Sequence, residues 1–197
     1  MNFYQGLKLI DRLKLPHPTW QFVRQGSKLN DLARIPAYAG WTIRTAAVAG
    51  AAYQNLYVNW LARTKVAATV DKFQRKLRGR GIFVVYPSWR WRKGGAVLVE
   101  PHQLVIEAVK GAVVDLARHG RVDVRYVIKR GRVVTVDGQS QLISQTELAK
   151  IKQPAKLLPR GSYYLEWGVS TRGQFIFYRL TDLATEGRAL LKKYGGS

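Results

Sequence analysis

The pattern of apolar and polar positions changes character near residue 80. In the first part, four apolar residues recur at helical spacing before "LPHP" ends the segment: Phe3, Leu7, Ile10 and Leu13. "TWQFV" (19–23) is typical of a short strand, and "SKLNDLAR" (27–34) begins with a serine cap. Residues 44–78 lack proline and are rich in Ala, Leu and Lys, which predicts one or two further helices.

Strand patterns dominate from residue 81 onward. "GIFVVYP", "AVLVE" and "QLVIEAV" are apolar runs of strand length, and "RVDVRYVIKRGRVVTV" is typical of a hairpin. "SQTELAKI" (144–151) predicts a capped short helix, and "TDLATEGRALLKKYG" (181–195) predicts an amphipathic C-terminal helix. We therefore expect an α+β protein in one compact unit. A helical N-terminal lobe (1–80) precedes a mainly antiparallel, sheet-rich lobe with a C-terminal helix (81–197).

The last predicted hairpin, "YYLEWGVSTRGQFIFYRL" (163–180), carries Glu166 among apolar residues and ends near Arg179. A two-residue turn at Arg172-Gly173 would set Glu166 opposite Arg179, with both side chains on one face. A three-residue loop would set Glu166 opposite Tyr178 and place Arg179 on the other face. The first register allows an ion pair, or a metal carboxylate beside a phosphate-binding arginine. The pattern leaves both registers open.

Charge is the outlying feature of the composition, because 33 Lys+Arg stand against 12 Asp+Glu, for a net charge of +21. The excess is spread along the chain, so the folded surface attracts polyanions: nucleic acid, nucleotides or an acidic protein partner. A solvated basic surface without one partner is the alternative. The candidate nucleic-acid contacts fall in "DKFQRKLRGRG" and "SWRWRKGG": Lys72, Arg75, Lys76, Arg78, Arg90, Arg92 and Lys93. Trp89 and Trp91 alternate with the last three, as in a base-stacking platform or a charge-protected sheet edge.

Several kinds of chemistry are excluded. The chain has no cysteine, so it has no disulfide, thiolate metal site or cysteine nucleophile. Its three histidines lack metal-ligand spacing, and neither a nucleophile elbow nor a Walker-type phosphate loop occurs. No apolar run approaches the length of a membrane span and no signal-peptide core is present, so we expect a cytoplasmic protein without a membrane partner.

Three carboxylates interrupt or end apolar strands: Glu100, Glu107 and Glu166. A buried carboxylate is costly unless it is paired or bound to a metal. Outward-facing strand positions would explain each one alone, whereas three in a chain with few acids favour a site for a cation or a cationic ligand.

Four segments, in chain order, resemble one family. "LVIEAVKG" (104–111) resembles "vviEavwGlGe" in the ATP-binding domain of phosphoenolpyruvate synthase and pyruvate phosphate dikinase, an ATP-grasp fold. Residues 163–180 resemble that domain's closing "diEWaid..g.lyilQaRP". "GWTIRTAA" (40–47) is similar to "YAVRSSA", and "GLKLIDRLKLPHPTWQFV" (6–23) is similar to "GgKganLgel.glpvPpgfvv".

The resemblance implies an ATP-grasp fold with ATP and Mg²⁺ as cofactors, held in a cleft between two lobes. Glu166 would be a magnesium carboxylate, and Arg44 and Arg179 would be the catalytic, phosphate-binding cations. Lys8 and Glu107 would contribute to the nucleotide site. "FVVYPSW" (83–89), with Tyr86, is similar to the strand and hinge that contact adenine in such folds.

The chain also departs from the family. Its ATP-binding region is shorter, the glycine-rich "GlGe" is replaced by "GAVV" (111–114), and Tyr178 replaces the glutamine before the arginine. The phosphohistidine and pyruvate-handling domains are absent, so the chain cannot perform a dikinase cycle alone. Two hypotheses stay open. One is an ATP-dependent phosphotransferase or ligase subunit, since phosphoryl transfer needs positioning and charge neutralisation. The other is a non-catalytic basic module that docks on nucleic acid or a nucleoprotein assembly.

Overall fold

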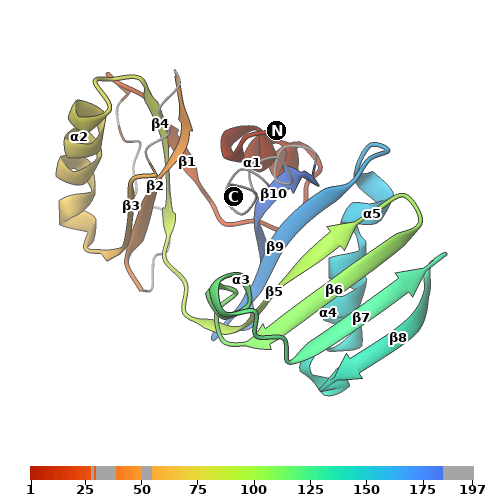
Figure 1. Cartoon of the computed structure of the whole chain (residues 1–197). Coiled ribbons are helices and arrows are strands. Elements are labelled where there is room, and N and C mark those ends of the chain that lie inside the picture. Colours follow the sequence, from red (N-terminus) through yellow and green to blue (C-terminus); the bar gives the residue numbers. More distant parts are fainter. Residues whose placement is uncertain (28, 30–38, 50–54, 184–197) are drawn as a thin grey trace, which may run out of the picture. The chain divides into compact units, whose positions relative to one another are not determined.

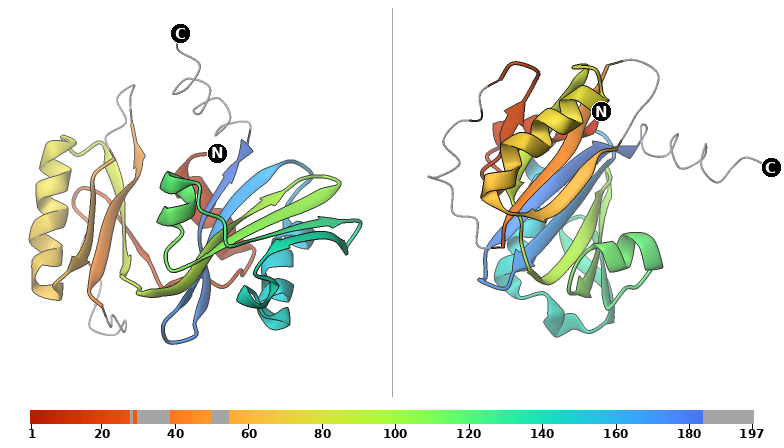
Figure 2. Two further views of the ribbon diagram at one scale, coloured as in Figure 1. Left: turned by 60° about the horizontal axis from the view of Figure 1, so that its bottom comes forward. Right: turned by 90° about the vertical axis from the view of Figure 1, so that its left-hand side faces the viewer.

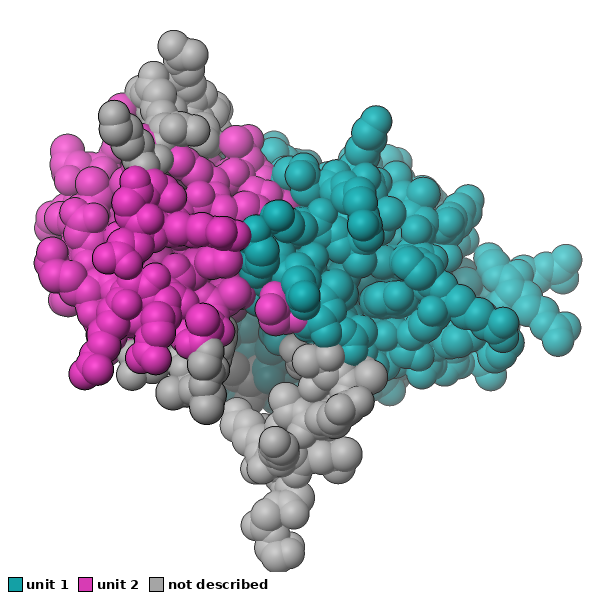
Figure 3. Space-filling view, turned by 90° about the horizontal axis from the view of Figure 1, so that it is seen from above, with its two compact units in different colours: residues 1, 3–17, 91–197 teal, residues 2, 18–90 magenta. Residues whose placement is uncertain are grey.

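The structure is a computed structural model that describes residues 1–27, 29, 39–49 and 55–183 (Figure 1). Contacts divide the chain into two compact units, which are coloured separately in Figure 3. One comprises Pro18–Arg90 with Asn2, and the other comprises Met1, Phe3–His17 and Trp91–Ser197. The division differs from the predicted lobes, 1–80 and 81–197 in one compact unit, because the N-terminal helix belongs to the larger, C-terminal unit.

The smaller unit is a four-stranded antiparallel sheet with a helix on one face. Its strands are β1 (Gln21–Val23), β2 (Trp41–Val48), β3 (Tyr57–Leu61) and β4 (Gly81–Pro87), in the order β1-β4-β2-β3. A 3₁₀ turn (Arg63–Lys65) leads into α2 (Val66–Lys76), which lies along the sheet (Figure 2). Val66 and Val70 of α2 are buried in one cluster with Ile43, Phe83 and Val85.

The helices predicted across 44–78 are wrong for much of that range. Among the described residues of that range, α2 and the short 3₁₀ turn before it are helical, whereas 44–48 and 57–61 are strands. The alanine content suggested a helix, but "WTIRTAAV" also carries β-branched residues that fit a pleated, half-buried surface. Residues 50–54 and nearly all of the predicted helix at 27–34 lie outside the described residues.

The larger unit is built on a six-stranded antiparallel sheet in the order β10-β9-β5-β6-β7-β8. Its strands are β5 (Trp91–Val99), β6 (Gln103–Lys110), β7 (Val124–Lys129), β8 (Arg132–Gly138), β9 (Tyr163–Ser170) and β10 (Phe175–Asp182). Its helices are α1 (Phe3–Arg12), α3 (Val114–His119), α4 (Gln145–Lys152) and α5 (Pro154–Leu157), with a 3₁₀ turn at Ser140–Leu142. The α+β prediction, with a mainly antiparallel sheet, is confirmed.

Helix α1 packs on β10, which explains why residues 3–17 join the larger unit. A Cβ at Gly6 would collide with the carbonyl oxygen of Leu180, so only glycine allows this approach. The amide of Phe177 donates to the carbonyl of Pro16, 2.7 Å away. Residues 181–182 of the predicted C-terminal helix are the end of β10, and nearly all of the rest of that segment lies outside the described residues.

The two faces of the six-stranded sheet differ in chemistry. The face that carries Val97, Ile106 and Trp167 is apolar, and α4 and α5 lie against it, behind the sheet in Figure 1. We call it the helix-covered face. The opposite face carries Glu166, Glu107 and Arg125, and we call it the charged face.

One charged pair is buried on the helix-covered face. The Lys93 ammonium on β5 donates to Glu147 on α4 at 2.7 Å and to the carbonyl of Leu142 at 2.5 Å. Glu147 also closes the predicted capping box, because Ser144 caps α4 and donates to the same carboxylate. Burial acts to raise the pKa of Glu147, but the hydrogen bonds from Lys93 and Ser144 together hold that pKa below its ordinary value. The pair therefore ties α4 to the sheet while its carboxylate stays ionised.

Among the described residues, no helix is long and apolar enough to cross a bilayer.

We expect Glu147→Gln to lower the free energy of unfolding by about 3 kcal/mol at neutral pH, because it leaves the buried Lys93 ammonium without its counter-charge. A carboxylate with a depressed pKa stabilises the fold above its unfolded-state pKa and loses that contribution as the pH falls. The difference between parent and variant should therefore shrink from about pH 5 downward. Urea unfolding across this pH range measures it. Asp137→Asn, at an exposed carboxylate of β8, is the matched control. At pH 3, about one unit below the ordinary pKa of a glutamate, the difference should have become smaller. A difference in unfolding free energy that stays constant down to this pH would contradict the lowered pKa of Glu147.

Candidate functional site

The 163–180 hairpin combines features of both predicted registers. Next to the turn, Phe175 pairs with Val169 and Phe177 with Trp167, which corresponds to a three-residue loop. A β-bulge between Phe177 and Arg179 then leaves Tyr178 as the extra residue, and beyond it Arg179 pairs with Glu166. The bulge therefore places Glu166 and Arg179 directly opposite each other, although the loop alone would have separated them.

Charged side chains form a row across the charged face. The register runs from Arg179 to Glu166, Ala96, Glu107, Arg125 and Asp137, one residue from each of the six strands. Glu166 and Glu107 flank Ala96, so two strand spacings, about 10 Å, separate their backbones. The side chain between them is a single methyl group. No bulky side chain of β5 therefore stands between the two carboxylates.

Each glutamate of the row accepts from one arginine through a single oxygen. Arg179 donates to Oε1 of Glu166 at 3.0 Å, and the Tyr164 hydroxyl lies 3.5 Å from the same oxygen. Arg125 donates to Oε1 of Glu107 from Nε at 2.7 Å and from Nη2 at 2.5 Å. Within the described part of the chain, Oε2 of either glutamate accepts no hydrogen bond. One oxygen of each carboxylate is thus available to a ligand.

The two ion pairs differ in burial. Glu166 is 7 % exposed, whereas Arg125, which holds Glu107, has a half-exposed side chain. The Arg179 guanidinium also lies over the ring of Tyr164, 5.9 Å from its centroid. The bulged Tyr178 stacks on Trp91 with ring centroids 5.2 Å apart, and Trp91 occupies the space above Gly168. Aromatic packing therefore supports the bulge that aligns the Glu166–Arg179 pair.

The other predicted nucleotide residues lie elsewhere. Lys8 is on α1, with its ammonium 4.9 Å from the ring centroid of Tyr4. Arg44 on β2 and Tyr86 on β4 belong to the four-stranded unit. Because Arg44 pairs with Val84 and Thr42 pairs with Tyr86, Arg44 and Tyr86 are diagonal neighbours on one face. That face is opposite the one on which Ile43 and Phe83 contact α2.

The predicted nucleic-acid residues fall into two groups. Six of them are exposed, at the end of α2 and at the start of β5: Lys72, Arg75, Lys76, Arg78, Arg90 and Arg92. Lys93 differs from the prediction, because it is 8 % exposed and its ammonium is bonded to Glu147. Trp91 packs on Tyr178 and Gly168, as the core-packing part of the alternative requires. The sheet-edge part of that alternative is wrong, because β5 lies between β9 and β6.

Two residues of the site were not predicted from the sequence. They are Arg125, which contacts Glu107, and Tyr164, which contacts Glu166. Arg125 lies in the alternating "VDVRYVI", where an outward-facing arginine gives no local signal of its partner. Only the β6–β7 register, which pairs it with Glu107, identifies it. Among the described residues, no group of three or more metal-binding side chains occurs. A metal ion on the charged face would therefore have at most two of these side chains as ligands.

The chain matches no protein-family model and no curated protein. Solved structures do resemble it. An ADP complex of N5-carboxyaminoimidazole ribonucleotide synthetase (PurK) aligns with 91% of the chain and 44% of its own length, at a TM-score of 0.55 and 16% identity. The D-alanine-D-alanine ligase of Coxiella burnetii aligns with 90% of this chain and 46% of that one, with a TM-score of 0.52 and 13% identity. The D-alanine-D-alanine ligase of Helicobacter pylori aligns with 92% of this chain and 50% of its own length, with a TM-score of 0.51 and 9% identity.

These structures are ATP-grasp ligases, and at such low identity the likeness establishes the fold alone. The chain has an ATP-grasp-like fold, as the resemblance of its segments predicted. It spans half or less of the length of these structures.

The burial of the two ion pairs predicts different coupling energies. In a double-mutant cycle with Glu166→Gln and Arg179→Gln, we expect a coupling of about 1 to 2 kcal/mol, since this pair is largely removed from water. The matched cycle with Glu107→Gln and Arg125→Gln should give less than about 1 kcal/mol, because water screens an exposed pair. Urea unfolding of the single and double variants measures both. Equal couplings, or a larger value for Glu107–Arg125, would contradict the register described above.

Proposed function

We propose that this chain binds a magnesium–nucleotide complex on the charged face and serves an ATP-dependent ligase or phosphotransferase. The observation that carries the proposal is the pair of glutamates beside Ala96, in each of which an arginine holds Oε1 and no described residue donates a hydrogen bond to Oε2. Mg²⁺ prefers oxygen ligands and is commonly held by one or two carboxylates together with substrate phosphates. Glu166 and Glu107 fit that requirement.

The arginines of the row have a complementary role. Arg179 and Arg125 each hold a carboxylate in place and add positive charge beside it that attracts an anion. A guanidinium neutralises phosphate charge without a proton transfer, which is the main demand of phosphoryl transfer. When bound, Mg²⁺ would add charge neutralisation of the phosphate oxygens. The protein's own contribution is thus to position anions and keep their counter-charges fixed.

The resemblance to phosphoenolpyruvate synthase and pyruvate phosphate dikinase refines this proposal. It assigns Lys8 and Arg44 to phosphate contacts and Tyr86 to an adenine contact, and these roles are part of the proposal. Ligase chemistry is favoured over a dikinase cycle, because the solved structures with a similar fold are ligases. A protein that consumes ATP would work in the cytoplasm, where we place it.

Isothermal titration with ATP and Mg²⁺ tests the nucleotide site. We expect binding that requires Mg²⁺, and a Kd at least tenfold weaker in Glu166→Gln, since a lost charged contact is worth about 1.5 kcal/mol or more. Glu107→Gln should act in the same direction. Asp137→Asn removes a carboxylate from the exposed end of the same row and should bind as the parent does. The absence of heat at millimolar nucleotide, or the same Kd in both glutamine variants, would remove the proposal.

A basic binding module is the second candidate function. It rests on four exposed cations that lie close together in the sequence, at the end of α2 and just beyond it: Lys72, Arg75, Lys76 and Arg78. No ion pair of the described residues neutralises them. Such a cluster fits the phosphates of nucleic acid or of a nucleoprotein assembly.

Fluorescence anisotropy with duplex DNA at several salt concentrations tests the module. The logarithm of the affinity should fall with the logarithm of salt, and the slope should decrease by about 0.9 for each phosphate contact that is lost. Substitution of these four residues by alanine should therefore weaken binding and flatten the slope. The control carries four alanines at scattered exposed cations of equal total charge: Arg12, Lys110, Lys129 and Arg160. If both variants weaken binding equally, the cluster has no special role.

A further inference from the structure

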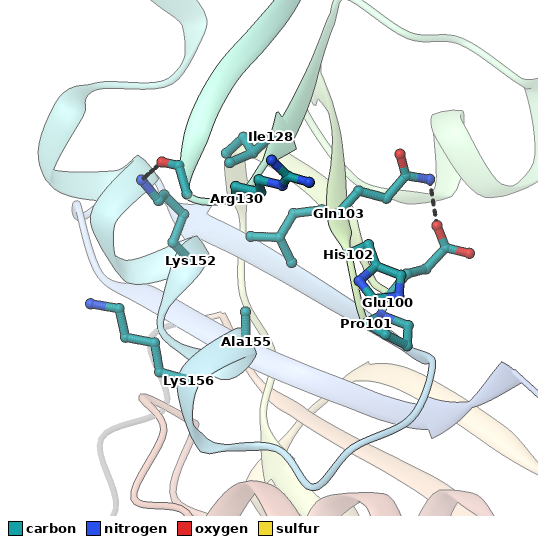
Figure 4. Close-up of a pocket in the computed structure, with 11 residues that line it drawn as sticks. Glu100, Pro101, His102, Gln103, Ile128, Arg130, Lys152, Ala155 and Lys156 are labelled. Atoms are coloured by element: carbon teal, nitrogen blue, oxygen red, sulfur yellow. Dashed lines mark hydrogen bonds between the residues drawn. The ribbon is translucent and has the colours of Figure 1, made fainter.

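A pocket opens on the helix-covered side of the six-stranded sheet, at the end remote from the β9–β10 turn (Figure 4). The β5–β6 turn forms one wall with Glu100, Pro101 and His102, and the β7–β8 turn forms another with Arg130 and Gly131. Helices α4 and α5 close it with Lys152, Ala155 and Lys156. The volume is about 280 Å³, close to the lower limit of small-molecule sites.

Three cations line the pocket, and no described carboxylate forms an ion pair with any of them. Arg130 and Lys156 form no ion pair with any described residue, and Lys152 donates only to the carbonyl of Gly131, at 3.4 Å. The single acidic side chain of the pocket, Glu100, accepts from Gln103 at 2.6 Å instead. In Figure 4 the Lys152 and Lys156 ammonium groups lie on one side, Arg130 lies above, and the Glu100–Gln103 pair is held on the far side. The pocket therefore offers positive charge that no internal group neutralises.

The floor of the pocket is apolar. Ile128 is 1 % exposed and Leu104 is 7 % exposed, and these two residues are cross-strand partners on β7 and β6. Ala155 and Pro101 add apolar atoms at the sides. A ligand without an apolar part would leave the apolar floor exposed to water. The combination instead fits an anion attached to an apolar group.

The β7–β8 turn holds Arg130 in an unusual backbone state. Lys129 pairs with Arg132, so Arg130 and Gly131 form a two-residue turn, with φ values of 49° and 78°. Turns of this kind favour Asn, Asp or Gly at both positions. An arginine in the first position is costly for the turn itself, which points to a use for its guanidinium. That guanidinium lines the pocket.

We infer that this pocket binds a small phosphomonoester whose organic part is apolar or aromatic, with the phosphate between Arg130, Lys152 and Lys156 and the organic part on Leu104 and Ile128. A dianionic phosphate matches a guanidinium and two ammonium groups in both charge and donor number. The site is separate from the nucleotide site proposed above. Leu104 and Glu107 lie three residues apart on β6, and so do Arg125 and Ile128 on β7, so the pocket floor and the charged row are on opposite faces.

Titration of the whole chain with phenyl phosphate tests the inference. Binding should be at least tenfold tighter than that of inorganic phosphate, because the ring covers the apolar floor, and tighter than that of benzyl alcohol, which lacks the charge. In ¹⁵N spectra, shifts should centre on Leu104, Ile128, Gly131 and Ala155. Equal affinity for phenyl phosphate and inorganic phosphate, shifts centred on the charged face, or no binding at millimolar phenyl phosphate would each overturn it.

Two variants and a control assign the binding to this pocket. Arg130→Asn removes the guanidinium and places a residue that the turn favours, so the fold is retained, and we expect at least tenfold weaker binding of phenyl phosphate. Lys156→Gln should weaken binding in the same direction. Lys129→Gln, next to the turn but on the charged face, removes the same charge and should change the affinity less than twofold. Equal weakening in all three variants would show that only general surface charge attracts the ligand and would overturn the inference.

Discussion

The bulge at Tyr178 is the constraint on which the charged face depends. A strand that slips by one residue turns every side chain to the other face. Without the extra residue, Arg179 would face the apolar side, among Phe177 and Trp167, and Glu166 would remain buried on the charged side without a counter-charge. The bulge corrects the register after Phe177, so the aromatic residues stay in the core and the arginine meets its carboxylate. Trp91, stacked on Tyr178, gives that irregular position a packing partner.

The same sheet uses charge differently on its two faces. On the helix-covered face the Lys93–Glu147 pair is buried: the ammonium also donates to the carbonyl of Leu142, and Oε2 of the carboxylate also accepts from Ser144. That pair ties a helix to a strand. On the charged face each carboxylate keeps one oxygen available, although both are already held by arginines. An ion pair that lies between a helix and a strand stabilises the fold alone, whereas an ion pair on a face without a covering helix can stabilise the fold and also bind a ligand.

Local signals in the sequence predicted local structure well. Ser144 and Glu147 predicted the start of α4 because a capping box involves only neighbouring residues. The strands of the 163–180 hairpin were also evident, but their register was not, since nothing in the hydrophobic pattern marks Tyr178 as a bulge. Residues 44–48 were misassigned to a helix because their alanines outweighed their β-branched residues. Helix α1 was correctly predicted but assigned to the wrong unit. Its contact with Leu180 joins two residues that are far apart in the sequence, and no local pattern indicates such a contact. Arg125 was missed for the same reason, because only strand pairing brings it to Glu107.

The excess of positive charge is not shared by the charged row. Arg179 and Arg125 contribute two positive charges there, and Glu166, Glu107 and Asp137 contribute three negative ones, in a chain whose net charge is +21. A polyphosphate alone would meet carboxylates at the centre of this row, which opposes its binding. Together with a divalent cation, the polyphosphate would place the positive charge of the metal beside the carboxylates and its own negative charge beside the arginines. The arrangement thus favours a metal–nucleotide complex over a free nucleotide. The pocket on the opposite face, where three cations surround a single and already bonded glutamate, suits an anion that needs no metal.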